Sequence, residues 1–400
     1  MNDSPATETL AERVRAAFSQ LHGDPRPVVW FAPGRVNLVG AHLDYSGGDV
    51  LPVTVELGVC IAIRPRTDRR VRLSSLDQPE RVDLDLSSLG SAKEPAQAWA
   101  AYPLGVSHML GERLGDRGFD AVFAGNLPMA SGMSSSAAIE VATAFALNDL
   151  FELGLSPREL ALVCHAAETR FVGVQCGIMD QFASALGREG HALLLHCADA
   201  SHEHVAIHGG GFQILVMDTK KPRTLASVAF NERVQQCLAA LKVLRGEVGW
   251  RDHLALYTVA DFERARHALE PVLQKRVRHV VSEMQRVGAA VAALTNGDAA
   301  ALGAALDQSH RSAALDYEVS CDELDVITDA ARECPEVFGA RLTGAGFGGC
   351  AIALIRPGTA DAVTDPVGRV FKDRFGVEPG FRVLRAGGGP RPIAAGGIRD

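Results

Sequence analysis

Residues 128–143, PMASGMSSSAAIEVAT, place Gly132 two residues before three consecutive serines, Ser134–Ser136. An apolar sequence typical of a helix follows, so hydroxyl groups and unpaired backbone N–H groups gather at a helix start. The helix macrodipole favours negative charge at that end, and the stretch could therefore bind phosphate. It is not a P-loop, because no Gly-Lys-Ser/Thr follows. A plain serine N-cap is an equal alternative, since Gly and Ser favour any helix start.

Three further stretches combine glycine with polar groups. The segment GRVNLVGAHLDYSGG, residues 34–48, is a loop framed by strands, and it holds side chains of the kinds that bind ligands: Arg35, Asn37, His42, Asp44 and Tyr45. In CGIMDQF, Asp180 stands at a transition from glycine to a helix, where a capping aspartate is as common as a functional one. An ordinary hairpin with an Arg–Asp pair would explain the first segment. A tight turn would explain the glycine-rich RLTGAGFGGCAIALI.

The composition is that of a soluble globular protein with 400 residues, of which 47% are hydrophobic and 22% charged. A net charge of −8 disfavours a dominant nucleic-acid footprint. No run reaches the roughly 18 apolar residues of a membrane span, and the first thirty residues show no signal peptide, so we expect a cytoplasmic protein. Eight scattered cysteines without paired spacing indicate reduced thiols rather than disulfides or zinc ligands.

The periodicity predicts an α+β order of elements. Helical spacing indicates helices over 6–21, 96–114 and 157–172, the second with Trp99 in the core and the third with Glu168, and a helical section over 262–331. Strand patterns occur at residues 28–33, 70–75, 81–86, 119–128, 191–197, 204–209 and 212–219. We expect two lobes that meet near residues 200–210, divided as 1–205 and 206–390, and a flexible tail over 391–400.

Three of these stretches are more specific together than separately. GRVNLVGAHLDYSGG, PMASGMSSSAAIEVA and LTGAGFGGCAIAL resemble the three motifs of the GHMP small-molecule kinases, and specifically those of the galactokinase family. CGIMDQF, SHRS and DYEVSCDEL resemble the same family, so the likeness covers residues 28–390. The resemblance implies an α+β, two-lobed GHMP kinase fold, with an N-terminal α+β lobe, a ferredoxin-like C-terminal lobe and an active site between them.

The resemblance also implies residue roles. Asp180 matches the general base toward the sugar's anomeric hydroxyl, and Arg35 matches the adjacent arginine, which would keep that carboxylate ionised. Ser136 and Glu168 match the ligands of Mg²⁺, a hard cation that suits oxygen donors. The other matches are to ATP-binding residues, namely Gly132, Met133, Ser134, Ser135, Ser136, Ala137, Trp99, Gly344 and Gly346, and to sugar-binding residues, namely Ala41, His42, Asp44, Gly177 and Phe230.

On the sugar side the chain departs from the family pattern. Ala41 stands where galactokinases carry a glutamate associated with the sugar's 6-hydroxyl, and Phe230 stands where they carry a tyrosine. Lys220 and Lys221 replace an Asn-Val pair, and Arg223 follows them. Fewer polar contacts and more positive charge would suit a carboxylate at carbon 6, so galacturonic acid is the leading substrate and galactose is close behind. The three cations could equally form a solvated loop.

A galactokinase-like regulator that binds sugar and ATP without chemistry is the alternative from a different class. Such relatives typically lack part of the SSSAA segment, which is complete here over residues 134–138. A mevalonate kinase would lack GRVNLVGAHLDY and the MDQ sequence. We therefore expect an ATP- and Mg²⁺-dependent sugar 1-kinase that binds neither nucleic acid nor membrane; its oligomeric state is not indicated.

Overall fold

The first lobe is built on a six-stranded sheet. In the computed structural model, which describes residues 5–23, 26–89, 99–128, 132–207, 211–222 and 226–394, the strand order is β13–β1–β3–β6–β4–β5. The bounds are β1 Val28–Asn37, β3 Pro52–Pro65, β4 Arg70–Ser75, β5 Val82–Asp85, β6 Phe119–Gly125 and β13 Arg391–Pro392. Residues of β1 and β3 are mostly buried on both sides, which explains why their sequences read as continuous apolar runs rather than as alternation.

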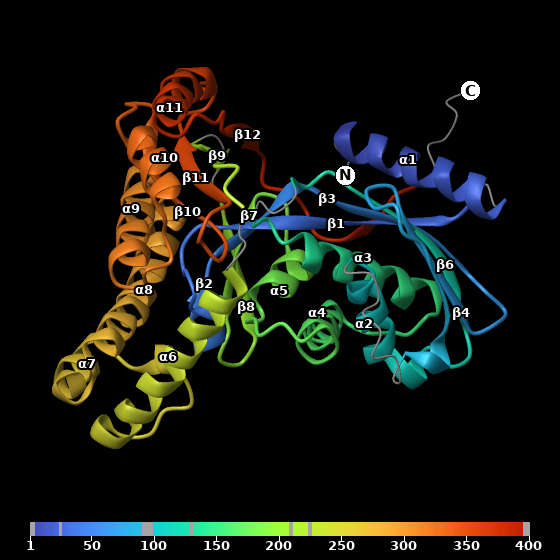
Figure 1. The fold of residues 1–400 in the computed structure, drawn as a ribbon, viewed down its shortest axis with the longest axis horizontal. Coiled ribbons are helices and arrows are strands. Elements are labelled where there is room, and N and C mark those ends of the chain that lie inside the picture. The colour runs from blue at the N-terminus through green and yellow to red at the C-terminus, as the bar shows by residue number, and fades with distance from the viewer. Residues whose placement is uncertain are drawn as a thin grey trace.

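Helices cover both faces of this sheet (Figure 1). On one face lies α1, Pro5–His22, which buries Leu10, Val14 and Phe18 against Phe31 and other sheet residues. The opposite face carries four helices, namely α2 Ala101–Leu110, α3 Ser135–Leu150, α4 Pro157–Ala166 and α5 Met179–Leu186. Contacts of α3 with both β1 and β3, and of α5 with β1, fix where these two helices begin. The sheet thereby holds the serine turn, residues 132–136, close to Asp180.

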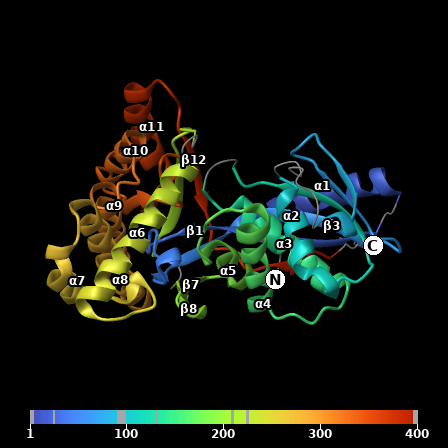
Figure 2. The same cartoon turned by 60° about the horizontal axis from the view of Figure 1, so that its bottom comes forward.

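The second lobe has a four-stranded antiparallel sheet in the order β10–β11–β9–β12. Its strands are β9 Gln213–Asp218, β10 Val337–Leu342, β11 Cys350–Ile355 and β12 Gly380–Leu384. The chain runs from β9 through helices to β10 and β11, then through a helix to β12, which is the ferredoxin-like connection predicted for this lobe. Its helices are α6 Ala226–Val248, α7 Val259–Ala265, α8 Pro271–Asn296, α9 Ala299–Leu315, α10 Asp322–Arg332 and α11 Ala360–Phe375. They stand apart from the helices of the first lobe (Figure 2).

A small three-stranded sheet precedes the junction of the lobes. It consists of β2 Asp49–Val50, β7 His191–His196 and β8 Ser201–Ala206, in the order β2–β7–β8. The predicted division at residues 205 and 206 falls at the end of β8.

The C-terminal segment returns to the first lobe. The amide of Gly387 donates to the carbonyl of Thr54, and β13 pairs antiparallel with β1. Arg15 of α1 donates to the carbonyl oxygens of Ile393 and Ala394, at 2.5 and 2.8 Å. The prediction of a flexible tail is therefore wrong for residues 391–394, because paired backbone and a buried Ile393 hold them to the sheet. The rest of that tail lies outside the described residues.

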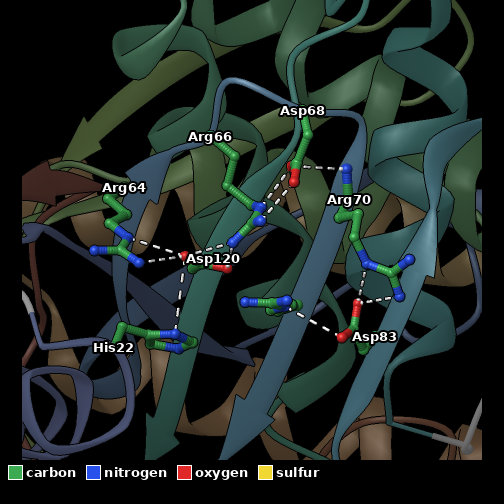
Figure 3. A network of polar contacts seen from close by, with 8 residues as sticks. His22, Arg64, Arg66, Asp68, Arg70, Asp83 and Asp120 are labelled. Atoms are coloured by element: carbon green, nitrogen blue, oxygen red, sulfur yellow. Dashed lines mark hydrogen bonds and ion pairs between the residues drawn. The ribbon is translucent and has the colours of Figure 1, made fainter.

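A buried carboxylate ties α1 to the sheet (Figure 3). Asp120, on β6, is completely buried and accepts hydrogen bonds of 2.9 Å from both Arg64 and Arg66, while His22 at the end of α1 lies 3.8 Å away. Arg66 also donates a hydrogen bond to Asp68, and Arg70 of β4 donates one to Asp83 on the neighbouring strand β5. A carboxylate so deep needs these partners, since an unpaired charge there would be strongly destabilising.

Two helix predictions differ from the structure in detail. The helix expected over 157–172 ends as α4 at Ala166 and continues as a π-helix over Ala167–Val172, which contains Glu168. Such π segments often occur at functional sites. Trp99 precedes α2 in a turn instead of lying within the helix, and residues 96–98 lie outside the described part.

The structure also bears on two expectations from composition. All eight cysteines, each in the described part of the chain, are thiols rather than disulfides. None of the helices among the described residues combines the length and apolar character needed to cross a bilayer.

Candidate active site

A cleft of about 630 Å³ gathers most of the predicted site residues from both lobes. Those that line it are Arg35, Ala41, His42, Asp44, Trp99, Gly132, Ser134, Ser135, Ser136, Glu168, Gly177, Asp180, Phe230 and Gly344. Three predicted ATP-binding residues do not line it, namely Met133, Ala137 and Gly346, all of which are buried. Met133 and Ala137 could therefore offer a ligand only their main-chain groups.

The carboxylate of Asp180 is held from two sides. Arg35 donates to Oδ1 through Nε at 2.8 Å and Nη2 at 2.5 Å, and the hydroxyl of Ser134 donates to Oδ2. The Asp180 side chain keeps 29% of its surface exposed, whereas Arg35 keeps only 5%. The cap of α5 is Ile178, without a side-chain cap bond, so the capping alternative for Asp180 does not describe this structure. The arrangement presents a charged acceptor to the cleft with a buried cation behind it.

The serine turn does not behave as an ordinary N-cap. Ser134 is the N-cap of α3, yet it makes no capping bond and has a left-handed backbone with φ 59°. Such a conformation is costly for a residue with a side chain, and here it accompanies a hydroxyl directed to Asp180 rather than to the helix. Arg35 joins the same turn by donating from Nη1 to the carbonyl of Gly132 at 2.5 Å. The N–H groups of the first turn of α3 have no partner within the helix and suit phosphate oxygens.

Asp44 lies in the cleft against Gly177. A Cβ atom at Gly177 would stand 2.2 Å from Oδ2 of Asp44, so any side chain there would displace the carboxylate. Burial raises the pKa of Asp44 to about 6, and the charge of Asp180 adds to that effect. A ligand hydroxyl that donates to Asp44 would stabilise its ionised form.

Two buried carboxyl groups lie near the serine turn. Burial raises the pKa of both Glu140 and Glu168, and the side-chain amide of Gln181 donates to each of them. The hydroxyl of Ser136 also hydrogen-bonds to Glu168. A serine hydroxyl beside a carboxylate fits a small divalent cation that keeps its remaining positions for water and phosphate. No cluster of three or more His, Cys, Asp or Glu suited to a metal occurs among the described residues.

His42 connects the loop of residues 34–48, which we call the sugar loop, to the third glycine-rich stretch, RLTGAGFGGCAIALI. Its Nδ1 lies 2.9 Å from the hydroxyl of Tyr45, and its Nε2 lies 3.1 Å from the carbonyl oxygen of Ala345. Burial lowers the pKa of His42 to about 3, so the ring is neutral. Because a carbonyl can only accept, Nε2 carries the proton and Nδ1 accepts from Tyr45. The ring centroid of Phe230 lies 5.6 Å from that of His42.

The predicted cations do not reach the sugar pocket. Lys220 and Lys221 each pair with a carboxylate at 2.6 Å, Asp218 and Glu323 respectively, and neither lysine lines the cleft. The expectation that these two lysines add positive charge beside the sugar is therefore wrong. Arg223 lies outside the described residues.

Several lining residues were not predicted. Tyr102, Val174 and Cys176 are among them, as is Asn37, which the sequence indicated only as part of a polar loop. Tyr102 follows Trp99 by three residues, a spacing that could have signalled a shared face. The buried Nε1 of Trp99 has no hydrogen-bond partner in the described structure.

Comparison with known proteins decides the family. Models of the GHMP kinases N terminal domain, the galactokinase galactose-binding signature and the GHMP kinases C terminal match residues 101–188, 16–65 and 290–373. A galactokinase from Clostridium beijerinckii is 37% identical over 384 residues, which cover 95% of this chain and 98% of the relative. One from Roseiflexus sp. is 39% identical over 382 residues, covering 94% and 95%. The chain belongs to the galactokinase family.

The fold of a solved galactokinase agrees with that assignment. The crystal structure of Lactococcus lactis galactokinase complexed with galactose has a TM-score of 0.91 and 34% identity, and the match covers 97% of this chain and 100% of that one. The Methanococcus jannaschii mevalonate kinase, at 18% identity and a TM-score of 0.65, shares the fold alone. The predicted two-lobed GHMP kinase fold is confirmed, and this member of the galactokinase family is a sugar kinase, a phosphotransferase with an alcohol acceptor.

Proposed function

We propose that the chain transfers the terminal phosphoryl group of ATP to the anomeric hydroxyl of galactose. The observation that carries this proposal is the Asp180 carboxylate, held by Arg35 and Ser134 at the point where the serine turn meets the cleft. A base, a cation and a helix N-terminus meet there, and such groups position the reactants and balance the charge in phosphoryl transfer. The relatives named galactokinase along nearly the whole chain, one of them solved with galactose, support this sugar.

Each residue then has a chemical role. Asp180 accepts the proton of the anomeric hydroxyl as its oxygen attacks phosphorus, and Arg35 keeps Asp180 ionised and offsets negative charge on the transferring group. Ser136 and Glu168 would hold Mg²⁺, which when bound neutralises charge on the ATP phosphates. The free N–H groups at the start of α3 bind phosphate oxygens. Asp44 accepts hydrogen bonds from ring hydroxyls, and Trp99, which lines the cleft, contacts the nucleotide.

The test is a phosphotransfer assay with ATP and galactose, followed by identification of the product as a sugar 1-phosphate. Asp180→Asn serves as the matched control, because it keeps the shape of the side chain and removes the base. Turnover that requires ATP and disappears in this variant supports the proposal. A wild-type protein that binds galactose and ATP tightly but never turns over would indicate a regulator instead.

A second candidate substrate is galacturonic acid. It rests on Ala41 and Phe230, both of which line the cleft and both of which lack the polar group that the family pattern carries there. An absent carboxylate at position 41 would leave a substrate carboxylate at carbon 6 without repulsion. Lys220 and Lys221 give this candidate no support, since both are paired elsewhere.

Parallel measurements of kcat/KM with the two sugars decide between them. Galactose favoured by tenfold or more eliminates the uronate, and the reverse ratio makes galacturonic acid the substrate.

A further inference from the structure

The sugar loop belongs to the first lobe in sequence, yet side chains of the second lobe hold its main chain. The carbonyl of Leu38 accepts from Nη1 of Arg341 at 2.9 Å. The amides of Gly40 and Ala41 donate to Oε1 of Glu283 at 2.9 and 3.0 Å, and the carbonyl of Ala41 lies 3.0 Å from Nε2 of His279. Four main-chain polar groups between Leu38 and Ala41 are thus paired with three side chains from α8 and β10.

Glu283 is the centre of this arrangement. Its side chain is completely buried, and its Oε1 accepts from Ser309 at 2.5 Å in addition to the two loop amides. Its Oε2 accepts from Nε of Arg286 at 2.5 Å. Although burial opposes the charge, Arg286 and the other nearby cations hold the pKa of Glu283 at about 2, so the carboxylate is ionised. Charge-assisted bonds to backbone N–H groups are stronger and more directional than neutral ones.

His279 fixes the other side of the Ala41 residue. Because the Ala41 carbonyl can only accept, Nε2 of His279 carries the proton and donates. Nδ1, 2.9 Å from the hydroxyl of Ser312, then accepts from that serine. Burial lowers the pKa of His279, in agreement with a neutral ring in this single tautomer.

An ordinary core ion pair does not account for these contacts. Arg286 occupies only Oε2 of Glu283, whereas Oε1 receives two successive amides from a loop more than 240 residues earlier in the chain. Gly40 adopts φ 99°, which glycine tolerates, whereas His42 adopts φ 58°, so the residue after Ala41 has a backbone conformation that is costly without outside support. With its amide and carbonyl both taken, Ala41 has one orientation left for its side chain in the cleft.

We propose that Glu283 and His279 are positioning residues for the sugar, which set sugar affinity by fixing the main chain of Gly40–His42 from the second lobe. This inference rests on the proposed sugar kinase function. Neither residue lines the cleft, so both act through the loop. The serine turn and Asp180 are held by other contacts. Loosening the sugar loop therefore weakens sugar binding and leaves the nucleotide site unchanged.

Matched variants test this. Glu283→Met removes the acceptor for both amides, Glu283→Gln keeps one acceptor oxygen, and Ser309→Ala removes a bond to the same Oε1 without touching the loop. We expect the sugar KM to rise at least tenfold in Glu283→Met, to rise less in Glu283→Gln, and to stay within twofold of wild type in Ser309→Ala. The KM for ATP should remain within twofold in all three.

A second pair of variants distinguishes a specific effect on the sugar loop from general misfolding. His279→Phe keeps an aromatic ring and frees the Ala41 carbonyl, whereas Ser312→Ala removes the contact on the far side of that ring, together with the bond of Ser312 to Asp316, and leaves the loop contact in place. Only the first should raise the sugar KM. Hydrogen exchange of a peptide covering residues 38–44 gives a readout independent of the reaction: exchange should accelerate in Glu283→Met and His279→Phe, and not in the two serine variants.

Equal effects of Glu283→Met and Ser309→Ala on both the sugar KM and exchange would overturn the inference, as would a matching rise in the ATP KM. If the wild type phosphorylates neither sugar, the proposed function fails. The exchange measurement then still shows whether Glu283 and His279 hold the loop.

Discussion

Sugar binding should release protons near pH 6. Burial and the charge of Asp180 raise the pKa of Asp44 to about 6 in the free protein. A ring hydroxyl that donates to Asp44 stabilises only its ionised form, so the complex has a lower pKa. Taking about 4, the ordinary value, for the complex, about half a proton leaves per sugar bound at pH 6, and about a tenth at pH 7.

The same coupling between Asp44 ionisation and sugar binding makes the affinity for sugar depend on pH. The protonated form of Asp44 dominates below pH 6 and is a weaker acceptor for a sugar hydroxyl than the carboxylate, so affinity is full above pH 7 and falls on the acid side. From pH 7 to pH 5 the dissociation constant should rise about tenfold, since the binding-competent fraction falls from about nine-tenths to about one-tenth.

Isothermal titration calorimetry without nucleotide measures both quantities. Titrations at pH 6 in two buffers of different ionisation enthalpy give the number of protons released, and a pH series gives the affinity. Asp44→Asn is the control, because it keeps the shape but cannot titrate; its weaker binding should release no proton. Heats that are identical in both buffers, together with a flat dissociation constant from pH 5 to pH 7, would refute the reasoning.

Four further predictions concern single substitutions. Asp180→Asn should lower kcat by about 10²- to 10⁴-fold with ATP binding intact, measured by steady-state kinetics and nucleotide titration; unchanged turnover would remove its role as base. Ala41→Glu should lower kcat/KM for galacturonic acid about tenfold or more relative to galactose, and an unaltered ratio would mean that position 41 does not face carbon 6. Asp120→Asn should cost about 1.5–3 kcal/mol of unfolding free energy in urea titrations without affecting kcat, because it weakens the charge-assisted hydrogen bonds that the part-buried Arg64 and Arg66 donate to the buried carboxylate. Arg15→Ala should cost about 1–2 kcal/mol by the same measurement, since the carbonyls of residues 393 and 394 lose their donor; no loss would show that the returning segment adds nothing to stability.

Local patterns predicted the elements well where one periodicity dominated. The helix expected over 6–21 is α1, the strand expected at 70–75 is β4, and the strand expected at 119–128 is β6, which ends earlier, at Gly125. The pattern failed where hydrogen bonding changes without a change of residue type. Nothing in AETRFV distinguishes a π-helix from an α-helix, and the paired segment after Pro390 is short and lies in a stretch rich in glycine and proline, a composition that local rules assign to mobile chain.

The site likewise has a part that local sequence predicts and a part that depends on tertiary contacts. Most of the motif residues line the cleft as the resemblance implied, because each motif brings its own turn and its own side chains, whereas Met133, Ala137 and Gly346 do not. The prediction that Lys220 and Lys221 face the sugar failed because each lysine pairs with a carboxylate, Asp218 at the end of β9 and Glu323 of α10, and residue type alone does not indicate where a side chain finds its partner in space. Ser134 illustrates the same point, since a serine before a helix is a cap by local rules, and only the position of Asp180 redirects its hydroxyl.

The sequence by itself determined the family, the two lobes and the set of groups proposed to bind phosphate and sugar, because residue types and short spacings carry that information. The tertiary structure alone decided which groups are paired, charged or buried. The pKa of Asp44, the neutral state of His42 and the hold of Glu283 on Gly40 and Ala41 all depend on atoms far apart in the chain. Electrostatic free energy follows distance and burial in space, and neither is written in the order of the residues.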